Sequence, residues 1–456
     1  MQNPAMSIKK ILFKRATFMV LLLWLFLTAA AQTQVEIHQI NVGNGDGAVI
    51  MLWDNNKLRY TIVIDGGLKS GGNDFIPYLK NVLPDDPAHG NKKRVDWVIL
   101  SHNHQDHFNG LIELFKDPAF LVREITDQGG YITSKGVYTM PLPEATTTNC
   151  VPFITRTKKN KTKPQQALVD YVAAVRTADL RTRVYFDSIT REKAFDTTTK
   201  EFLYIPLPSV GGIPVEMDCI ATNAFTDGKA GRDIGGKNPN NFSFGWVLRY
   251  GEFRFYSGGD LGGYTGGYTD QETPMAAYLT NEYPTNYPMT GSRTATNYPG
   301  HVCVMKTDHH GSTESSRPEF LQTLAPSAIV TSAGQHKRWK IPTVPFVRRV
   351  AATPAFDSVR GVYFTQLYNY PNNKSLTEAN SKFKTKTTYN YVEPGPTSAN
   401  QYSYKFVIKP STVYARMPQK PDTTIDIKTC SIYTVYKIRT SDNQQTAQAV
   451  YLCHKP

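Results

Sequence analysis

The sequence predicts an α/β fold in which short strands and helices alternate through the first half of the chain. Alternating apolar residues over 35–42 are typical of a strand, and the largely apolar segment at 95–100 is typical of a strand in a covered sheet. Residues 74–83 and 108–116 each follow predicted strands and are predicted to be helices. This alternation favours a layered α/β architecture.

The remaining predicted elements continue the pattern. A turn at 54–57 separates strands at 45–52 and 60–65, and a helix is predicted at 165–177. The second half contains a predicted helix at 344–353 and several more strands. These strands lie at 215–224, 242–250, 252–260, 301–312 (where the strand ends in a polar loop), 327–334 and 361–367.

The first residues predict an export signal. Four basic residues precede an apolar stretch that ends in alanines, with cleavage expected after Ala31. We therefore expect residues 1–31 to be removed, leaving a periplasmic or extracellular protein without a stable membrane span; a retained membrane anchor is the alternative. The signal carries four of the positive charges behind the formal net charge of +13, so the mature chain would carry +9. A basic chain suits anionic partners such as nucleic acid, phosphorylated glycans or a lipid surface.

The rest of the chain is expected to form one main domain over 32–370 and a small β-rich extension over 371–456. The domain is interrupted at 262–300 by a Tyr- and Gly-rich insertion, which is either a surface excursion bordering the site or an irregular loop without a role. After about Tyr370 the helical pattern is absent and the segments predict β hairpins. Cys430 and Cys453 flank one predicted hairpin and are the expected disulfide pair, whereas the other cysteines are expected to be buried thiols.

A histidine-rich segment, "SHNHQDHFNG" at 101–110, lies between a predicted strand and a predicted helix, where open α/β sheets place their sites. It carries His102, His104, Asp106 and His107, and imidazole and carboxylate groups are ligands for zinc and similar metals. We predict that one pair holds one metal and the second pair another. Two such metals can share a bridging hydroxide and polarise a phosphoryl or carbonyl oxygen.

The remaining ligands must come from later in the chain, because no histidine lies between His107 and His301. Asp260 ends the predicted strand "FYSGGD" and is expected to bridge two metals, with a turn aspartate as the alternative. One of His309 and His310 is expected to complete the second metal site. The other would support the ligands or donate a proton, and the residues leave open which is which.

These motifs, in this order, resemble the metallo-β-lactamase superfamily. "SHNHQDH" is similar to its H-x-H-x-D-H signature. Over residues 35–367, "INVGNGDGAVI", "YTIVIDGG", "NNFSFGWVLRYGEFRFYSGGD", "MKTDHHGSTESS" and "SAIVTSAGQHKRWKIPT" resemble the hydrolase domain of ComEC-like proteins. The channel-forming membrane segments of ComEC are absent, so the resemblance implies a stand-alone exported hydrolase, as in the similar phosphorylcholine esterases.

The resemblance implies an αββα sandwich with a small C-terminal β appendage, holding one or two Zn²⁺ ions, with Mn²⁺ as an alternative. The implied metal ligands are His102, His104, Asp106, His107, Asp260 and one histidine of the pair His309 and His310. Asp65 and Asp46 match aspartates that orient such a cluster without binding the metal. Asp106, Lys306 and His310 are the implied catalytic residues, with Lys306 meeting a substrate phosphate or a developing oxyanion.

Two departures from the family pattern stand out. The histidine that often lies between the first motif and the bridging aspartate is absent, and Ile341 replaces the histidine expected before Pro342. His336, earlier in the same loop, is expected either to compensate as a ligand or substrate contact or to be a plain loop residue. Arg338 beside Trp339 suits a phosphodiester with a base to stack on, or else belongs to a solvated charged loop.

These observations favour an exported hydrolase that uses a metal-bound hydroxide on phosphoester or phosphodiester substrates, either nucleic acid or phosphorylated surface groups. Hydrolysis of a lactone or a β-lactam is the first alternative, because the same cluster can perform it. A non-catalytic binding module is the second, although the nearly complete ligand set argues against it.

Overall fold

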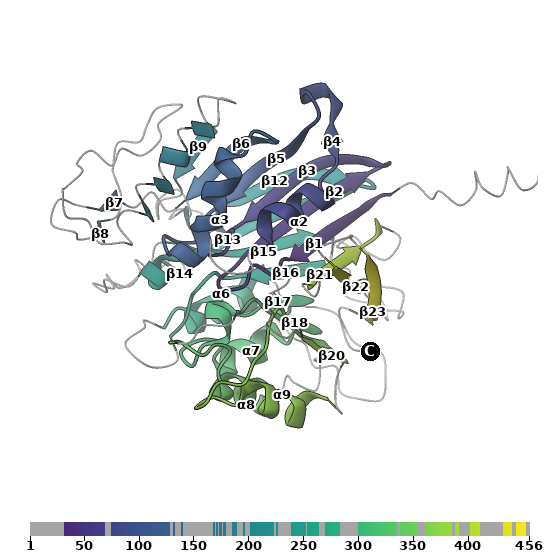
Figure 1. Ribbon diagram of the computed structural model, residues 1–456. Helices are drawn as coiled ribbons and strands as arrows, with labels where there is room; N and C mark the ends of the chain where they lie inside the picture. The colour runs from purple at the N-terminus through teal and green to yellow at the C-terminus, as the bar shows by residue number, and fades with distance from the viewer. Residues whose placement is uncertain are drawn as a thin grey trace, which may run out of the picture.

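Two mixed β-sheets lie face to face in the computed structural model, and helices cover their outer faces (Figure 1). The structure describes residues 32–68, 74–127, 201–222, 225–226, 239–251, 253–263, 270–282, 300–334, 338–353, 361–384, 388–391, 402–410, 432–439 and 444–452, with short pieces between 131 and 196. The arrangement confirms the predicted αββα sandwich.

The first sheet has the strand order β23-β22-β21-β1-β2-β3-β5-β6-β9, and β4 pairs with β5 at one end. Neighbouring β1, β2 and β3 are antiparallel, whereas β3, β5 and β6 run parallel. The strands are β1 (Gln34–Gln39), β2 (Ala48–Asp54), β3 (Lys57–Ile64), β4 (Asp85–Asp86), β5 (Lys92–Ile99), β6 (Phe120–Asp127), β9 (Tyr185–Ser188), β21 (Tyr402–Ile408), β22 (Ile432–Arg439) and β23 (Gln445–Leu452).

The second sheet has the strand order β12-β13-β15-β16-β17-β18-β19-β20, with β14 paired to β13. From β16 onward its strands are parallel. The strands are β12 (Tyr204–Val210), β13 (Ile213–Thr222), β14 (Phe225–Thr226), β15 (Gly245–Tyr250), β16 (Phe253–Ser257), β17 (Val304–Lys306), β18 (Ala328–Thr331), β19 (Gly361–Phe364) and β20 (Thr388–Tyr391).

Three apolar layers hold the sandwich together. Between the sheets, Trp97 and Trp246 meet edge to face with ring centroids 5.5 Å apart. On the outer face of the first sheet pack α2 (Phe75–Val82) and α3 (Gln105–Lys116). On the outer face of the second pack α6 (Glu272–Glu282), α7 (Pro318–Leu324), α8 (Val344–Ala352) and α9 (Ser375–Phe383), which Figure 1 shows grouped together in green.

Two expectations about helices are wrong. The helical pattern does not end near Tyr370, because Ala379 and Phe383 lie four positions apart in α9 and bury one face of it. The described part of the insertion at 270–282 is not a surface excursion, because Met275 and Leu279 of α6 are buried against the second sheet. The extension at 371–456 contributes β20 to the second sheet and β21–β23 to the first, where β21 pairs with β1.

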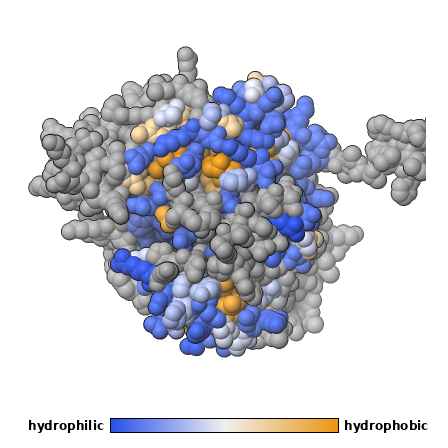
Figure 2. Space-filling model, viewed as in Figure 1, coloured by the Kyte–Doolittle hydropathy of each residue, from blue (hydrophilic) through white to orange (hydrophobic). Residues whose placement is uncertain are grey.

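Several other expectations concern the chain outside this core. Residues 1–31 and the expected Cys430–Cys453 pair lie outside the described residues. Cys219 is a buried free thiol as expected, but Cys303 is disulfide-bonded, a pairing that spacing along the chain does not reveal. Within the described ranges every helix is too short or too polar to cross a membrane. Figure 2 shows a described surface that is largely hydrophilic on the face viewed, with some apolar areas.

Candidate metal centre

The candidate centre lies at one edge of the sandwich, where strands of both sheets end. Asp65 follows β3 and His102 follows β5, and these parallel strands end side by side. Asp260 follows β16 and His310 follows β17, which are parallel in the second sheet. Carboxyl ends of adjacent parallel strands form the crevice in which α/β proteins bind ligands.

Helix α3 begins at Gln105, earlier than the predicted helix at 108–116. Its first turn therefore carries two residues of the histidine-rich segment, Asp106 and His107. Its Gly110 lies against Gly66 so closely that a Cβ atom there would be 1.9 Å from the Gly66 carbonyl oxygen. The Gly66 N–H donates to the His107 carbonyl oxygen at 2.7 Å. This close approach brings the His107 ring to Asp65.

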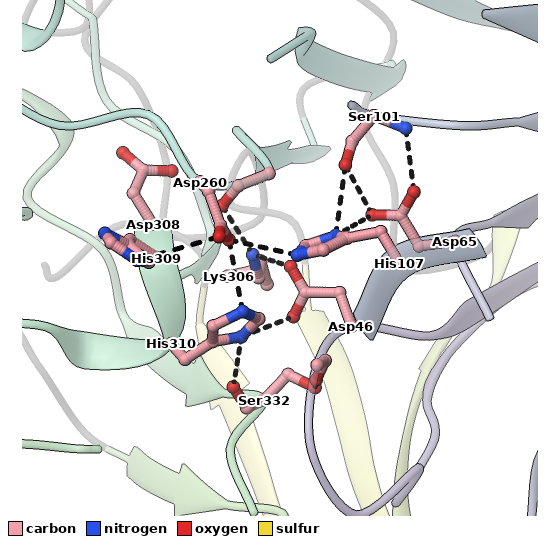
Figure 3. Close-up of polar contacts among 12 residues, drawn as sticks. Asp46, Asp65, Ser101, His107, Asp260, Lys306, Asp308, His309, His310 and Ser332 are labelled. Atoms are coloured by element: carbon pink, nitrogen blue, oxygen red, sulfur yellow. Dashed lines mark hydrogen bonds and ion pairs between the residues drawn. The ribbon is translucent and has the colours of Figure 1, made fainter. Parts of the chain in front are cut away.

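Four buried side chains form the inner group, which consists of Asp46, His107, Asp260 and His310. Each offers one ligand atom, and these atoms all lie within 4.8 Å of one another. The Nε2 atoms of His107 and His310 lie 3.3 and 3.2 Å from Asp260 Oδ1 (Figure 3). This set of imidazole and carboxylate atoms fits a transition-metal ion.

A second group, the outer group, contains His102, His104 and Asp260, with ligand atoms again within 4.8 Å of one another. His102 Nε2 lies 3.6 Å from Asp260 Oδ2 and 3.0 Å from His104 Nδ1. Asp260 therefore turns one oxygen to each group, which is the arrangement of a bridging carboxylate.

Hydrogen bonds behind the inner histidines aim their Nε2 atoms at Asp260. His107 Nδ1 donates to Asp65 Oδ2 at 2.8 Å, and His310 Nδ1 donates to the Ser332 carbonyl oxygen at 3.0 Å. Asp65 is held by Ser101, whose N–H and hydroxyl donate to it at 2.7 and 2.6 Å. The second ring N–H of a metal-ligating histidine typically donates a hydrogen bond to a carboxylate or a carbonyl oxygen in this way.

Apart from ion pairs such as those of Asp260 with His107 and His310, the inner ligand atoms have no hydrogen-bond partner among the described residues. Asp46 Oδ1, His107 Nε2, Asp260 Oδ1 and His310 Nε2 are all buried and, within the described part of the chain, accept or donate no hydrogen bond of normal geometry. Buried polar atoms rarely lack a partner, so four together around one point indicate the place of a cation.

The electrostatics of the inner group also favour positive charge. Burial alone would raise the pKa of Asp260, but His310 and His107 hold it well below its usual range. Burial alone would lower the pKa of His310, but Asp260 and Asp46 raise it to about 10. The pKa of His107 is likewise raised well above its usual range, against burial, by Asp260 and Asp65. Without a metal, protons on the two rings supply the charge that a cation would bring.

The double histidine lies on a strained turn after β17. His309 and His310 both have positive φ angles, of 45° and 54°, so their side chains diverge. His310 enters the inner group, whereas the side chain of His309 is 18% exposed at the rim, with Nε2 3.7 Å from Asp260 Oδ2. Asn240 Nδ2 lies 3.2 Å from the same His309 nitrogen.

Other predicted site residues take different places. Asp106 belongs to neither group; its side chain is 34% exposed, with Oδ2 3.6 Å from His310 Nε2. Lys306 is buried, and its Nζ atom contacts Asp46 and the Gly259 carbonyl oxygen; its predicted contact with a substrate phosphate or oxyanion stays a prediction. His336 lies outside the described residues.

Two exposed side chains lie on the loop after β18. Arg338 Cζ lies 4.5 Å from the centre of the Trp339 ring, and Trp339 is 59% exposed. The loop starts near Ser332, which holds His310, and it returns to Thr343, whose N–H donates to the Gly311 carbonyl oxygen. The predicted contact of Arg338 with substrate stays a prediction.

Sequence reasoning missed three supporting residues. Ser101 donates to Asp65, the Ser332 carbonyl oxygen accepts from His310, and Asn240 contacts His309. Ser101 and Ser332 lie within two residues of the ends of β5 and β18, so their place at the ends of parallel strands is a usable signal.

Comparison with known families agrees with this geometry. Residues 43–217 match the family model described as the metallo-beta-lactamase superfamily. That part of the chain is similar to the superfamily, and it includes the histidine-rich segment at 101–110. No curated protein sequence matches the chain significantly.

Solved structures that match part of the chain include three from different organisms. CmlA, a diiron beta-hydroxylase from Streptomyces venezuelae, is 13% identical with a TM-score of 0.35, over 79% of this chain, which spans only 53% of that protein. Human tRNase Z, short form, is 13% identical with a TM-score of 0.31, over 66% of this chain and 93% of that one. Zn²⁺-bound PqqB from Methylobacterium extorquens is 9% identical with a TM-score of 0.27, over 60% of this chain and 72% of that one.

Proposed function

We propose that this protein is an exported metal-dependent hydrolase of phosphoesters or phosphodiesters, with Zn²⁺, or Mn²⁺ as the alternative, in the inner and outer groups. The observation that carries the proposal is the pair of His/Asp groups sharing Asp260, with four unsatisfied buried ligand atoms in the inner group. Bound ions of this kind polarise a phosphoryl oxygen and stabilise negative charge in the transition state.

The residues of the chain have separate tasks in this proposal. Asp260 links the two groups and fixes their separation, because each of its oxygens faces a different group. Asp65 and the Ser332 carbonyl oxygen keep the protons of His107 and His310 on Nδ1, so that both Nε2 atoms stay available.

His309 is suited to move a proton at the rim of the centre. Burial lowers the pKa of its ring, so the ring is neutral near pH 7. Its Nε2 atom faces Asp260 Oδ2 from a partly exposed position, and its Nδ1 atom lies 3.1 Å from the Ser312 hydroxyl. A neutral, positioned imidazole can accept a proton from an attacking group and return it to a leaving group.

Support for an anionic, exported substrate comes from the sequence. The formal net charge of +13 and the signal-like residues 1–31 favour an exported protein with nucleic acid or phosphorylated glycan or lipid as substrate. The motif order favours the ComEC-like branch of the superfamily. The exposed Arg338–Trp339 pair offers a cation and a stacking surface to a phosphodiester that carries a base.

The test is hydrolysis of a substrate panel by the mature protein loaded with Zn²⁺ or Mn²⁺. The panel contains a phosphomonoester, a phosphodiester, single-stranded DNA, phosphorylcholine esters, a lactone and a β-lactam. We expect the fastest turnover on a phosphoester and a loss of at least about 100-fold in Asp260→Asn.

The matched control is Asp218→Asn on β13, which removes a buried carboxylate that pairs with Arg249 of β15 and should keep full activity. A protein that binds no metal would contradict the whole proposal. Faster turnover of the lactone or β-lactam would contradict the phosphoester part alone.

A further inference from the structure

Asp46 lies inside the inner group, although the family resemblance implies only an orienting role for it. We propose that Asp46 is itself a metal ligand in this chain, and that Lys306 is the positioning residue that turns its Oδ1 atom toward the metal. The inference rests on the proposed function, because it adds a ligand to the same centre.

The loop before β2 is fixed so that the Asp46 side chain enters the group. The Asp46 N–H donates to the Asp106 carbonyl oxygen at 3.2 Å, and the Ser332 hydroxyl donates to the Gly45 carbonyl oxygen at 2.9 Å. Gly45 has a φ angle of +98°, and a Cβ atom there would lie 1.7 Å from the Asp106 carbonyl oxygen. The glycine thus permits a contact between this loop and α3 that any side chain would prevent.

Lys306 binds one oxygen of Asp46, Oδ2, and so leaves the other, Oδ1, to face the inner group. Its Nζ atom pairs with Asp46 Oδ2 and donates to the Gly259 carbonyl oxygen at 2.9 Å, next to Asp260. Lys306 and Asp46 are 1% and 4% exposed, so water does not compete for this pair. Lys306 therefore holds the loops of two inner ligands together.

The other oxygen, Oδ1, faces the unsatisfied ligand atoms. It lies 3.4 Å from His310 Nδ1, but that nitrogen already donates to the Ser332 carbonyl oxygen. Among the described residues Oδ1 has no hydrogen-bond partner, as is true of the facing atoms of His107, Asp260 and His310. A cation bonded to all four would satisfy them together, which a merely orienting aspartate would not require.

The experiment is metal titration of the full mature protein after chelator treatment, with bound metal counted by elemental analysis. Isothermal titration with Zn²⁺ gives the affinities, and the visible absorption of bound Co²⁺ reports the ligand set without any assay of activity. We expect wild type to bind two ions, and Asp46→Asn to bind one of them more than about 100-fold more weakly, beyond the roughly 10–100-fold loss typical of residues that only orient a ligand. The Co²⁺ spectrum of that ion should change.

Lys306→Met tests the positioning role. We expect it to weaken the same ion, and we expect the double variant Asp46→Asn/Lys306→Met to be no weaker than Asp46→Asn, because Lys306 acts through Asp46. The double variant also removes both buried charges, so it stays informative if Asp46→Asn alone does not fold.

The outcomes separate the two proposals. If wild type binds no metal, the proposed function fails. If wild type binds two ions while Asp46→Asn and the double variant bind both with wild-type affinity and an unchanged Co²⁺ spectrum, only the role of Asp46 is overturned. Losses that add in the double variant would overturn the positioning role of Lys306.

Discussion

Asp65→Asn replaces one carboxylate oxygen by an amide NH₂ group at the residue that orients His107. Asp65 Oδ1 accepts from the Ser101 N–H at 2.7 Å, and Oδ2 accepts from the Ser101 hydroxyl at 2.6 Å and from His107 Nδ1 at 2.8 Å. Both oxygens thus face N–H donors. In either orientation of the asparagine, its NH₂ group meets one of these donors.

The expected effect has two components. If the NH₂ group faces His107, the ring must move its proton to Nε2, the atom that faces Asp260, and that nitrogen can no longer bind a metal. Changing the partner of a ligating histidine typically costs 10–100-fold in metal affinity, or about 1.4–2.7 kcal/mol. A buried donor without an acceptor also lowers the free energy of unfolding of the metal-free protein by about 1–3 kcal/mol.

The assay compares Zn²⁺ affinity by isothermal titration with stability by urea denaturation of the chelated protein. Asp96→Asn is the matched control, since Asp96 is also a buried aspartate on this sheet, but its partners are Thr61, Arg94 and Arg123 instead of a histidine. We expect the control to lose stability and keep its metal affinity. Wild-type affinity in Asp65→Asn, or an equal loss in Asp96→Asn, would refute the argument.

Four further outcomes are expected. Because the pKa of His310 is raised to about 10 and that of His107 also lies well above its usual range, Zn²⁺ binding at pH 7 should release about two protons, measured by titration in buffers of different ionisation enthalpy. The same raised pKa values stabilise the metal-free protein fully below about pH 6.5, so its Tm should fall as the pH rises toward 10, and a rising Tm would contradict this. Trp246→Ala should lower the free energy of unfolding in urea by about 3–5 kcal/mol, because Trp246 fills the layer between the sheets; a loss below about 1 kcal/mol would show that the layer repacks. Arg349→Met should lower the free energy of unfolding by about 1–3 kcal/mol and slow turnover, because the buried guanidinium donates to backbone carbonyls in the segment 312–316, which follows His310. Unchanged turnover would show that this segment does not support the centre.

Much of the fold follows from local pattern. The apolar runs at 95–100 and 327–334 correspond to β5 and β18, because strands buried on both faces need apolar side chains on both. Helices α6 and α9 were missed for a related reason. Each buries few residues among many polar ones, so the apolar spacing is weak until the sheet beneath the helix is known.

The motifs along the chain identify which residues are candidates for the centre. These residues all lie within four residues of the end of a strand or in the first turn of the next helix, and polar side chains at such ends indicate one edge of a sheet; they are Asp65, His102, His107, Asp260 and the double histidine.

The folded structure, and not the motifs, shows which of these candidates lie in the inner group and which at its rim. It brings His310 into the inner group and leaves His309 at the rim, because two successive residues with positive φ send their side chains apart. It brings Asp46 inside and leaves Asp106 partly exposed, because the loop before β2 lies against the start of α3. Spacing along a chain limits which groups can meet, but the direction of each side chain is set by the packing of the two sheets.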